Sequence, residues 1–296
     1  MRRVLYVSAF VPCENARHAG GRVAYENLSR LRASAAVVDA LVCSTEAGMQ
    51  EAARLAGVHL VGQQPWNLVR YLMHEGCTLG LQAVLTAPVM HTRLSLEAHY
   101  RLLDLLKTHD YDEVFVDFTQ AVLLVQRAVA AAALAWPVKT TLCLHDVWAQ
   151  RMLRTPGVVS TLVTGLVVQQ EQRLVAGADA VLVLSDKDGS LLCSLYAVRH
   201  VTVKPFSAPA WTASVRRSVA SIDPRMLVFF GNFDRPDNST AAAWFLESAM
   251  DEIECAAPGV KLVLLGTGSD RLARRLGDRR VSGTGFVDDP SPYFSR

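Results

Sequence analysis

Short runs that are apolar almost throughout alternate with longer segments in which apolar residues recur every three or four positions. Continuous apolar runs are typical of parallel strands buried on both faces, and the wider spacing is typical of helices with one buried face. Over the first two hundred residues this alternation predicts a doubly wound α/β domain. The predicted strands are Val4–Ala9, Ala36–Cys43, Val58–Val61, Glu113–Phe118, Lys139–His145 and Ala180–Ser185. The predicted helices are Tyr25–Arg32, Leu94–Lys107, Ala121–Ala135 and Thr161–Val175.

The alternation lapses over Pro205–Pro224, where three prolines and many small residues indicate a linker. It then resumes, and the elements expected are a strand at Met226–Phe230, a helix at Thr240–Glu254, a strand at Lys261–Leu265, a helix at Arg271–Leu276 and a strand at Arg280–Phe286. The predicted domains are therefore residues 1–204 and 225–296, joined by the linker 205–224. Three strands make only one half of a dinucleotide-binding fold, so we expect the second domain to be incomplete.

Composition narrows the class of protein. Apolar residues make up 51% of the chain and charged residues 20%, as in a well-buried globular protein. The net charge of +2 is spread along the chain, which argues against a nucleic-acid partner. The six cysteines are scattered without metal-ligand spacing, so we expect reduced thiols, no metal site and a cytoplasmic setting. The longest apolar stretch, Ala128–Pro137, is too short to span a bilayer, although contact with the inner membrane face stays open.

Ligands of open α/β sheets bind beyond the carboxyl ends of the strands, which directs attention to the loops there. Gly20 and Gly21 follow the first strand and precede a helix. Paired glycines at a helix start let backbone N–H groups approach a phosphate, with the helix dipole assisting. The alternative is a tight turn that only closes the strand–helix unit, since the spacing is not that of a dinucleotide fingerprint.

His145 and Asp146 follow the apolar run that ends in LCL. A histidine at a strand end can hydrogen-bond a ligand hydroxyl or phosphate, and the alternative is a structural role. Asp146 can equally cap the next helix. Glu171 lies within a predicted helix and is expected to be a surface charge. Ser185, which ends the next strand, is a candidate helix cap.

The second domain repeats the strand–glycine–helix order. Gly231 and Asn232 end its first strand, and Asn238 is a candidate N-cap of the helix that follows. Arg235 is the nearest cation for a diphosphate, although an exposed loop arginine is the simpler interpretation. The segment LLGTGSDR lacks a third glycine and a suitably placed acid, so a nicotinamide-dependent oxidoreductase is not indicated.

Several stretches together resemble the GT-B glycosyltransferases of the large family 4 group, with glycosyltransferase 1 and 4-like domains. The stretches are the first strand with its HAGG loop, EQRLVAGADAVLVLSDKD, and above all FFGNFDRPDNSTAAAWFLESAMDEIECAAPGVKLVLLGTGSD with VSGTGFVDDPSPYF. The resemblance implies two Rossmann-like domains facing across a cleft, an acceptor domain followed by a donor-binding domain. Many relatives hold the donor diphosphate with an Arg and a Lys, where this chain has Asn232 and Asp237.

The resemblance also implies an activity and a set of site residues. The activity is transfer of a sugar, with retention, from a nucleotide-sugar to a glycan or lipid-linked acceptor in cell-surface polysaccharide synthesis. No metal or other cofactor is expected. Gly20 and Gly21 would lie near the phosphates, His145 near the sugar as the catalytic residue, Gly231, Asn232 and Arg235 beside the diphosphate, and Phe286 and Val287 at the base.

A second hypothesis is a non-catalytic homologue that binds a glycan or a partner protein. Its basis is the family's Glu-x7-Glu segment for ribose and sugar, which would follow Phe294 and is not in this sequence. The chain is accordingly expected to be a C-terminally short form with little activity alone. The open sheet of its second domain could be covered in an oligomer.

Overall fold

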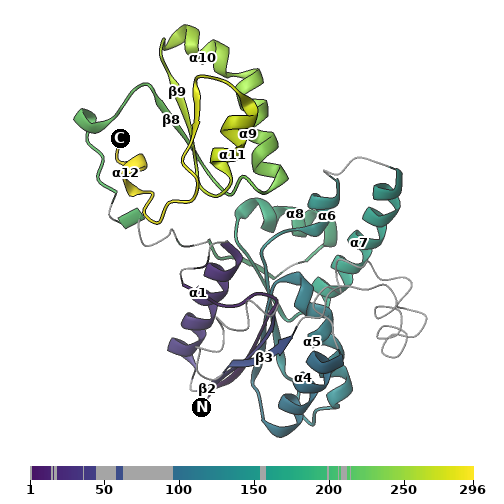
Figure 1. Cartoon of the computed structure of the whole chain (residues 1–296). Coiled ribbons are helices and arrows are strands. Elements are labelled where there is room, and N and C mark those ends of the chain that lie inside the picture. Colours follow the sequence, from purple (N-terminus) through teal and green to yellow (C-terminus); the bar gives the residue numbers. More distant parts are fainter. Residues whose placement is uncertain are drawn as a thin grey trace. The chain divides into compact units, whose positions relative to one another are not determined.

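The structure, a computed structural model, divides into two compact units, Met1–Phe206 and Ser207–Arg296. Each unit is described by itself, and Figure 1 shows the elements of both. The residues described are 2–14, 16, 19–35, 37–44, 58–62, 96–153, 158–198, 200–205, 207, 212–213 and 215–296. The stretch Gln64–Pro88 lies outside them, as do the first residues of the predicted segments Ala36–Cys43 and Leu94–Lys107 and part of the predicted linker.

The first unit is built on a seven-stranded sheet in the order β3-β2-β1-β4-β5-β6-β7, in which every neighbouring pair is parallel. The strands are β1 (Arg3–Ser8), β2 (Val37–Ser44), β3 (Val58–Gly62), β4 (Glu113–Asp117), β5 (Lys139–Leu144), β6 (Ala180–Val183) and β7 (Val201–Val203). Successive strands run outward from β1 in one direction and from β4 in the other. The carboxyl ends of β1 and β4 therefore form the switch point at which ligands of such sheets bind.

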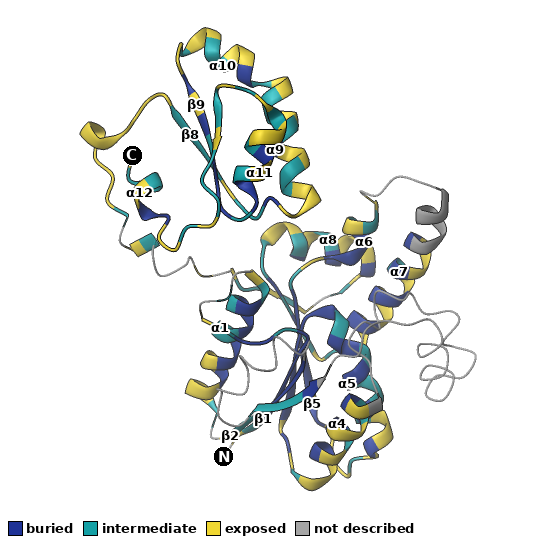
Figure 2. Ribbon diagram, viewed as in Figure 1, coloured by how far each residue is buried: buried dark blue, intermediate teal, exposed yellow. Residues whose placement is uncertain are grey.

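Helices cover both faces of this sheet. They are α1 (Ala19–Ser34), α4 (Leu96–Thr108), α5 (Thr119–Ala132), α6 (Trp148–Leu153), α7 (Val158–Ala176) and α8 (Asp186–Tyr196). On one face Leu28 and Leu31 of α1 pack on Tyr6 and Phe115 of the sheet. On the other face α4, α5 and α7 contribute to a larger apolar cluster with the sheet. Figure 2 shows the strands buried and the outer sides of the helices exposed, the division that the apolar periodicity predicts.

The second unit has a three-stranded parallel sheet in the order β10-β9-β8. Its elements are a short 3₁₀ turn (Val219–Ser221), β8 (Met226–Phe230), α9 (Pro236–Ser248), α10 (Met250–Ala256), β9 (Lys261–Leu265), α11 (Ser269–Leu276), β10 (Val281–Gly283) and α12 (Ser291–Phe294). Met250, Leu262, Leu264 and Leu272 form the centre of its apolar core. Both units are thus α/β with parallel, Rossmann-like sheets, as predicted.

Three details differ from the sequence-based expectations. The predicted single helix Thr240–Glu254 is two helices, because Ala249 between them has φ −128° and ψ −26°, outside the helical range. Met250, which follows the break, is fully buried. β7 was not predicted, and β10 covers only Val281–Gly283 of the predicted strand Arg280–Phe286. Among the described helices, none combines the length and the apolar character needed to cross a bilayer.

Candidate active site

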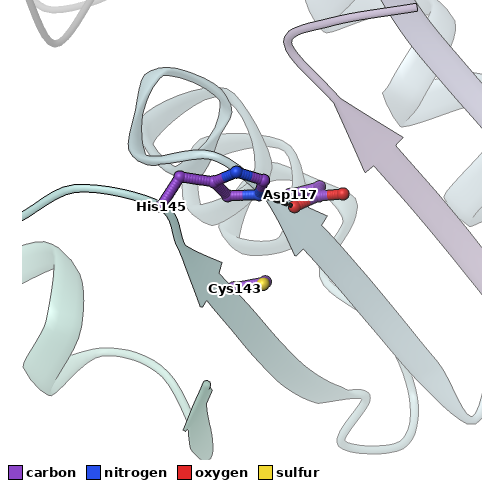
Figure 3. Close-up of side chains that lie close together, drawn as sticks. All are labelled: Asp117, Cys143 and His145. Carbon is purple, nitrogen blue, oxygen red and sulfur yellow. Dashed lines mark hydrogen bonds and ion pairs between the residues drawn. The ribbon is translucent and has the colours of Figure 1, made fainter. Parts of the chain in front are cut away.

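His145 follows β5 directly, at the carboxyl edge of the seven-stranded sheet. Its side chain is 10% exposed, so most of it is enclosed by the unit. Nε2 lies 2.6 Å from Oδ1 of Asp117, the last residue of β4. Figure 3 shows this pair with Cys143, which lies on β5 two residues before His145. The side chains meet because β4 and β5 are neighbours and both end here.

Asp117 is fully buried and accepts hydrogen bonds from three side chains. In addition to His145, the Tyr6 hydroxyl donates to Oδ2 at 2.6 Å and the Asn27 amide donates to the same oxygen at 3.0 Å. A buried carboxylate is tolerated only when its oxygens are paired in this way. Burial, followed by the neighbouring Asp117 charge, raises the pKa of Tyr6 well above its usual value, which keeps the phenol protonated as a donor.

Lys204 completes the buried network. It follows β7, and its ammonium donates to Oδ1 of Asn27. Burial, and then the charge of Arg30, lowers the pKa of Lys204. Since the ammonium can only donate, it fixes the orientation of the Asn27 amide, whose nitrogen then faces Asp117. Three elements far apart in sequence, α1, β4 and the end of β7, therefore converge beneath His145.

Phe118 holds the imidazole from the side. Its ring stacks on His145 with centroids 3.6 Å apart and an interplanar angle of 23°. The ring of Phe10 packs against the ring of Phe118, with centroids 4.6 Å apart. The backbone of Phe118 has φ 77°, a region that residues with a side chain rarely occupy. Such a conformation costs about 1–3 kcal/mol and is maintained only where the surroundings impose it. Here the Phe118 N–H donates to the carbonyl of Cys143 at 3.0 Å, which ties the turn to β5.

Glu171 of α7 supports the segment that follows His145. Its carboxylate accepts hydrogen bonds from the backbone N–H groups of Trp148 at 2.8 Å and Ala149 at 3.0 Å, and from the Tyr196 hydroxyl at 2.7 Å. The expectation that Glu171 is a surface charge was wrong, because the residue is fully buried. Burial is the main cause of its raised pKa. Glu171 supplies the acceptors that the first N–H groups of α6 lack within their own helix.

The same cluster offers a set of atoms that could hold a metal ion. A carboxylate oxygen of Asp117, the sulfur of Cys143 and a ring nitrogen of His145 lie within 4.8 Å of one another. These groups, however, already have hydrogen-bond partners, since Asp117 accepts from His145 and the Asn27 amide contacts the Cys143 sulfur at 3.6 Å. Burial, and then the Asp117 charge, raises the pKa of the Cys143 thiol. The geometry therefore fits a hydrogen-bonded network better than a metal site.

Gly20 and Gly21 lie in the first turn of α1, beyond the carboxyl end of β1. Gly21 is buried, and its carbonyl accepts a hydrogen bond from the N–H of Cys13 at 3.1 Å, which closes the loop between strand and helix. Asn15, Arg17 and His18 of that loop lie outside the described residues. Both glycines thus share the carboxyl edge of the sheet with His145, while their contact with a phosphate stays a prediction.

The other predicted site residues belong to the second unit. Gly231 pairs with β9 through its N–H and the Leu265 carbonyl at 3.0 Å. The Asn232 side chain accepts from the N–H of Asp234 at 3.0 Å, so it shapes the turn. Arg235 is exposed and lies 3.4 Å from Asp237.

Two further residues of the second unit were predicted to line the base pocket, and one was predicted to cap a helix. Phe286 is exposed and Val287 is half-buried. Asn238 is not the N-cap of α9, because the helix begins at Pro236 and the Asn238 amide instead donates to the Asn232 carbonyl at 2.8 Å. In the first unit, by contrast, Ser185 caps α8 as predicted.

No protein-family model matches the chain, and no curated protein is significantly similar to it in sequence. Solved structures are similar in fold. Sucrose-phosphate synthase from Thermosynechococcus elongatus is 14% identical with a TM-score of 0.62, over 99% of this chain and 73% of that one. α,α-Trehalose 6-phosphate synthase from Burkholderia multivorans is 12% identical with a TM-score of 0.55, over 97% and 72%. The lipopolysaccharide outer core galactosyltransferase WaaB is 12% identical with a TM-score of 0.54, over 97% and 69%.

These neighbours are GT-B glycosyltransferases, and the likeness shows that the chain has their type of α/β fold. The sequence analysis selected His145 as a candidate, and the structure places it at the carboxyl edge of the sheet. The residues that hold His145 were not selected. Asp117 carried a signal, since it ends the run EVFVD on a strand of the same sheet. Tyr6, Asn27 and Lys204 carried none, because their convergence depends on strand order and on the face of α1 that packs on the sheet.

Proposed function

We propose that the chain is a glycosyltransferase that moves a sugar from a nucleotide-sugar donor to a hydroxyl of a glycan or lipid-linked acceptor. One observation carries the proposal: a GT-B fold places a partly exposed histidine at the carboxyl edge of its first sheet, held by a buried carboxylate that ends β4 at the switch point. A partly exposed residue that a buried partner holds in place is suited to bind a ligand group in a defined orientation.

In this proposal His145 contacts the sugar, and Gly20 and Gly21 contribute backbone N–H groups near the phosphates. Gly231, Asn232 and Arg235 act beside the diphosphate, and Phe286 and Val287 beside the base. The anomeric configuration is retained, with the departing diphosphate assisting the acceptor hydroxyl, so that no metal or other cofactor is required. The reaction serves cell-surface polysaccharide synthesis in the cytoplasm, at the inner face of the membrane.

The test is transfer from a panel of UDP- and GDP-sugars to acceptor glycans, with product configuration read by NMR. His145→Ala is expected to lower turnover by about 10- to 100-fold, the loss that follows from removing one strong hydrogen bond. His200→Ala is the matched control, since His200 is exposed and has no side-chain role in the site. Equal turnover of the His145→Ala variant and the wild type would remove His145 from the mechanism.

A second candidate function, binding without catalysis, is favoured by the charges of the second unit. Arg235 lies beside Asp237, and Arg271 forms a 2.5 Å ion pair with Asp234, so both cations near the glycine loop already have acidic partners. An arginine neutralised in this way holds a diphosphate less strongly. Calorimetric titration separates the two functions: an enzyme binds a nucleotide-sugar and turns it over, while a glycan-binding homologue binds the glycan and leaves every donor intact.

A further inference from the structure

The hydrogen bonds beneath His145 determine which of its ring nitrogens carries the proton. The ammonium of Lys204 can only donate, so Oδ1 of Asn27 faces Lys204 and the amide nitrogen faces Asp117. Oδ2 of Asp117 therefore accepts from Asn27 at 3.0 Å and from the Tyr6 hydroxyl at 2.6 Å. The Tyr6 oxygen also lies 3.2 Å from the Ala24 carbonyl, but the shorter contact takes the hydroxyl proton. Oδ2 of Asp117 thus acts as the acceptor of both donors, as a carboxylate oxygen does.

An ionised Asp117 can only accept, so the contact at 2.6 Å requires a proton on Nε2 of His145. The neutral imidazole then has Nδ1 as a hydrogen-bond acceptor. No described residue hydrogen-bonds to Nδ1. Stacking on Phe118 fixes the plane of the ring, and the bond to Asp117 fixes its rotation within that plane. Both orientation and tautomer are therefore set before any ligand arrives.

We propose that Asp117 is the positioning residue of this site, which holds His145 in the Nε2–H tautomer and so gives the imidazole one available acceptor, Nδ1, for a hydroxyl group of a bound sugar. The role of the sugar rests on the proposed function, whereas the tautomer does not. A hydroxyl donates readily to a bare imidazole nitrogen, and a site built around such an acceptor disfavours a sugar that lacks that hydroxyl.

The tautomer can be read directly by ¹⁵N NMR of the histidine side chains. The chain has 8 histidines, and comparison with the His145→Asn spectrum assigns the signal. The expected result is a protonated, pyrrole-type Nε2 and a bare, pyridine-type Nδ1 in the ligand-free wild type. A protonated Nδ1 with a bare Nε2 would overturn the proposal, and this outcome needs no variant of Asp117 and no activity.

Asp117→Asn sharpens the test, because the direction of its effect is fixed by the network. Tyr6 and Asn27 both donate toward the Oδ2 position, so the carbonyl oxygen of the new amide takes that place. The amide nitrogen then faces His145 and requires Nε2 to accept, which moves the proton to Nδ1. We expect the ¹⁵N signals of His145 to exchange character while the other histidines stay unchanged. An unchanged tautomer in a folded Asp117→Asn protein would contradict the assignment.

Asp110→Asn is the matched control, since Asp110 is exposed and has no side-chain partner among the described residues. In the transfer assay Asp117→Asn is expected to lower kcat/KM by ~10-fold or more, the value of one lost hydrogen bond to the sugar. The control should match the wild type. If the wild type transfers no sugar but shows the expected tautomer, the proposed function fails and the role of Asp117 stands. If transfer occurs with the opposite tautomer, the role of Asp117 fails and the function stands.

Discussion

The carboxylate of Glu171 lies 2.8 Å from the backbone nitrogen of Trp148, so that α7 holds the first turn of α6 beside His145. Glu171→Gln replaces one of the accepting oxygens with an amide that donates, which leaves a buried N–H or hydroxyl without an acceptor. We expect the free energy of unfolding of the first unit to fall by about 1–3 kcal/mol. This change in the free energy of unfolding can be measured by urea unfolding, with tryptophan fluorescence as the signal. Tyr196→Phe removes only the hydroxyl that donates to Glu171 at 2.7 Å, so it should lower the free energy of unfolding by less than Glu171→Gln does.

This effect should depend on pH. Burial raises the pKa of Glu171 above its usual value of 4.5, so the folded state binds the proton more tightly than the unfolded state does. The contribution of Glu171 to stability is then greatest below pH 4.5 and declines as the pH rises through the folded-state pKa. Gln cannot titrate, so the stability difference between wild type and Glu171→Gln should shrink over that range. A difference that grows with pH would show that hydrogen bonding outweighs burial.

Phe118 offers a test of backbone strain. Alanine at this position keeps φ 77° and loses the ring, whereas glycine adopts this conformation without strain. Phe118→Gly should therefore be about 1 kcal/mol more stable than Phe118→Ala. The same pair of substitutions at Phe115, in the regular strand β4, should show the opposite order. If the alanine variant is the more stable one at both positions, the turn at Phe118 relaxes when the ring is removed.

The fold followed closely from the sequence because its signals are local. A strand such as Val4–Ala9, buried on both faces, must be apolar along its length, and the structure has a strand at Arg3–Ser8. His145 could be selected for the same reason, since its place after a buried strand fixes its position at the carboxyl edge. The break at Ala249 could not be predicted, because one non-helical residue barely changes the apolar periodicity.

The network beneath His145 could not be predicted from local patterns. Tyr6 reads as one more apolar residue of a strand, and Asn27 as a polar residue on a helix. Lys204 is 177 residues from the Asn27 side chain that it contacts. Each residue acquires its role only when the strand order is known, because neighbours in the sheet are distant in the chain. Burial likewise decided the role of Glu171, for a helical glutamate in a sequence is ordinarily a surface charge.

The left-handed backbone of Ala197 provides a test of helix termination. Ala197 ends α8 with φ 53°, and its N–H donates to the carbonyl of Cys193. Glycine is the residue best suited to this position, so Ala197→Gly should raise the free energy of unfolding by about 0.5–1 kcal/mol. Ala130→Gly, an exposed position within α5, should lower it by a similar amount of about 0.5–1 kcal/mol. Thermal unfolding of both variants checks the opposite signs, and a loss of stability in both would contradict the assignment at Ala197.

The loop at Gly266 in the second unit is packed too closely for a residue with a side chain. A β-carbon at Gly266, where φ is 126°, would lie 2.2 Å from the carbonyl oxygen of Gly231. Gly266→Ala must therefore displace the loop after β8, and it should cost about 1–3 kcal/mol from overpacking in addition to backbone strain. Gly277→Ala is the control, because it has φ 66° but nothing within 4 Å of the added carbon, so it bears strain alone.

If Gly231 acts beside a diphosphate, Gly266→Ala should also weaken nucleotide binding in calorimetry, whereas Gly277→Ala should leave it unchanged. Equal binding by the two folded variants would place the nucleotide away from the Gly231 loop, even if Gly266→Ala proves the less stable protein.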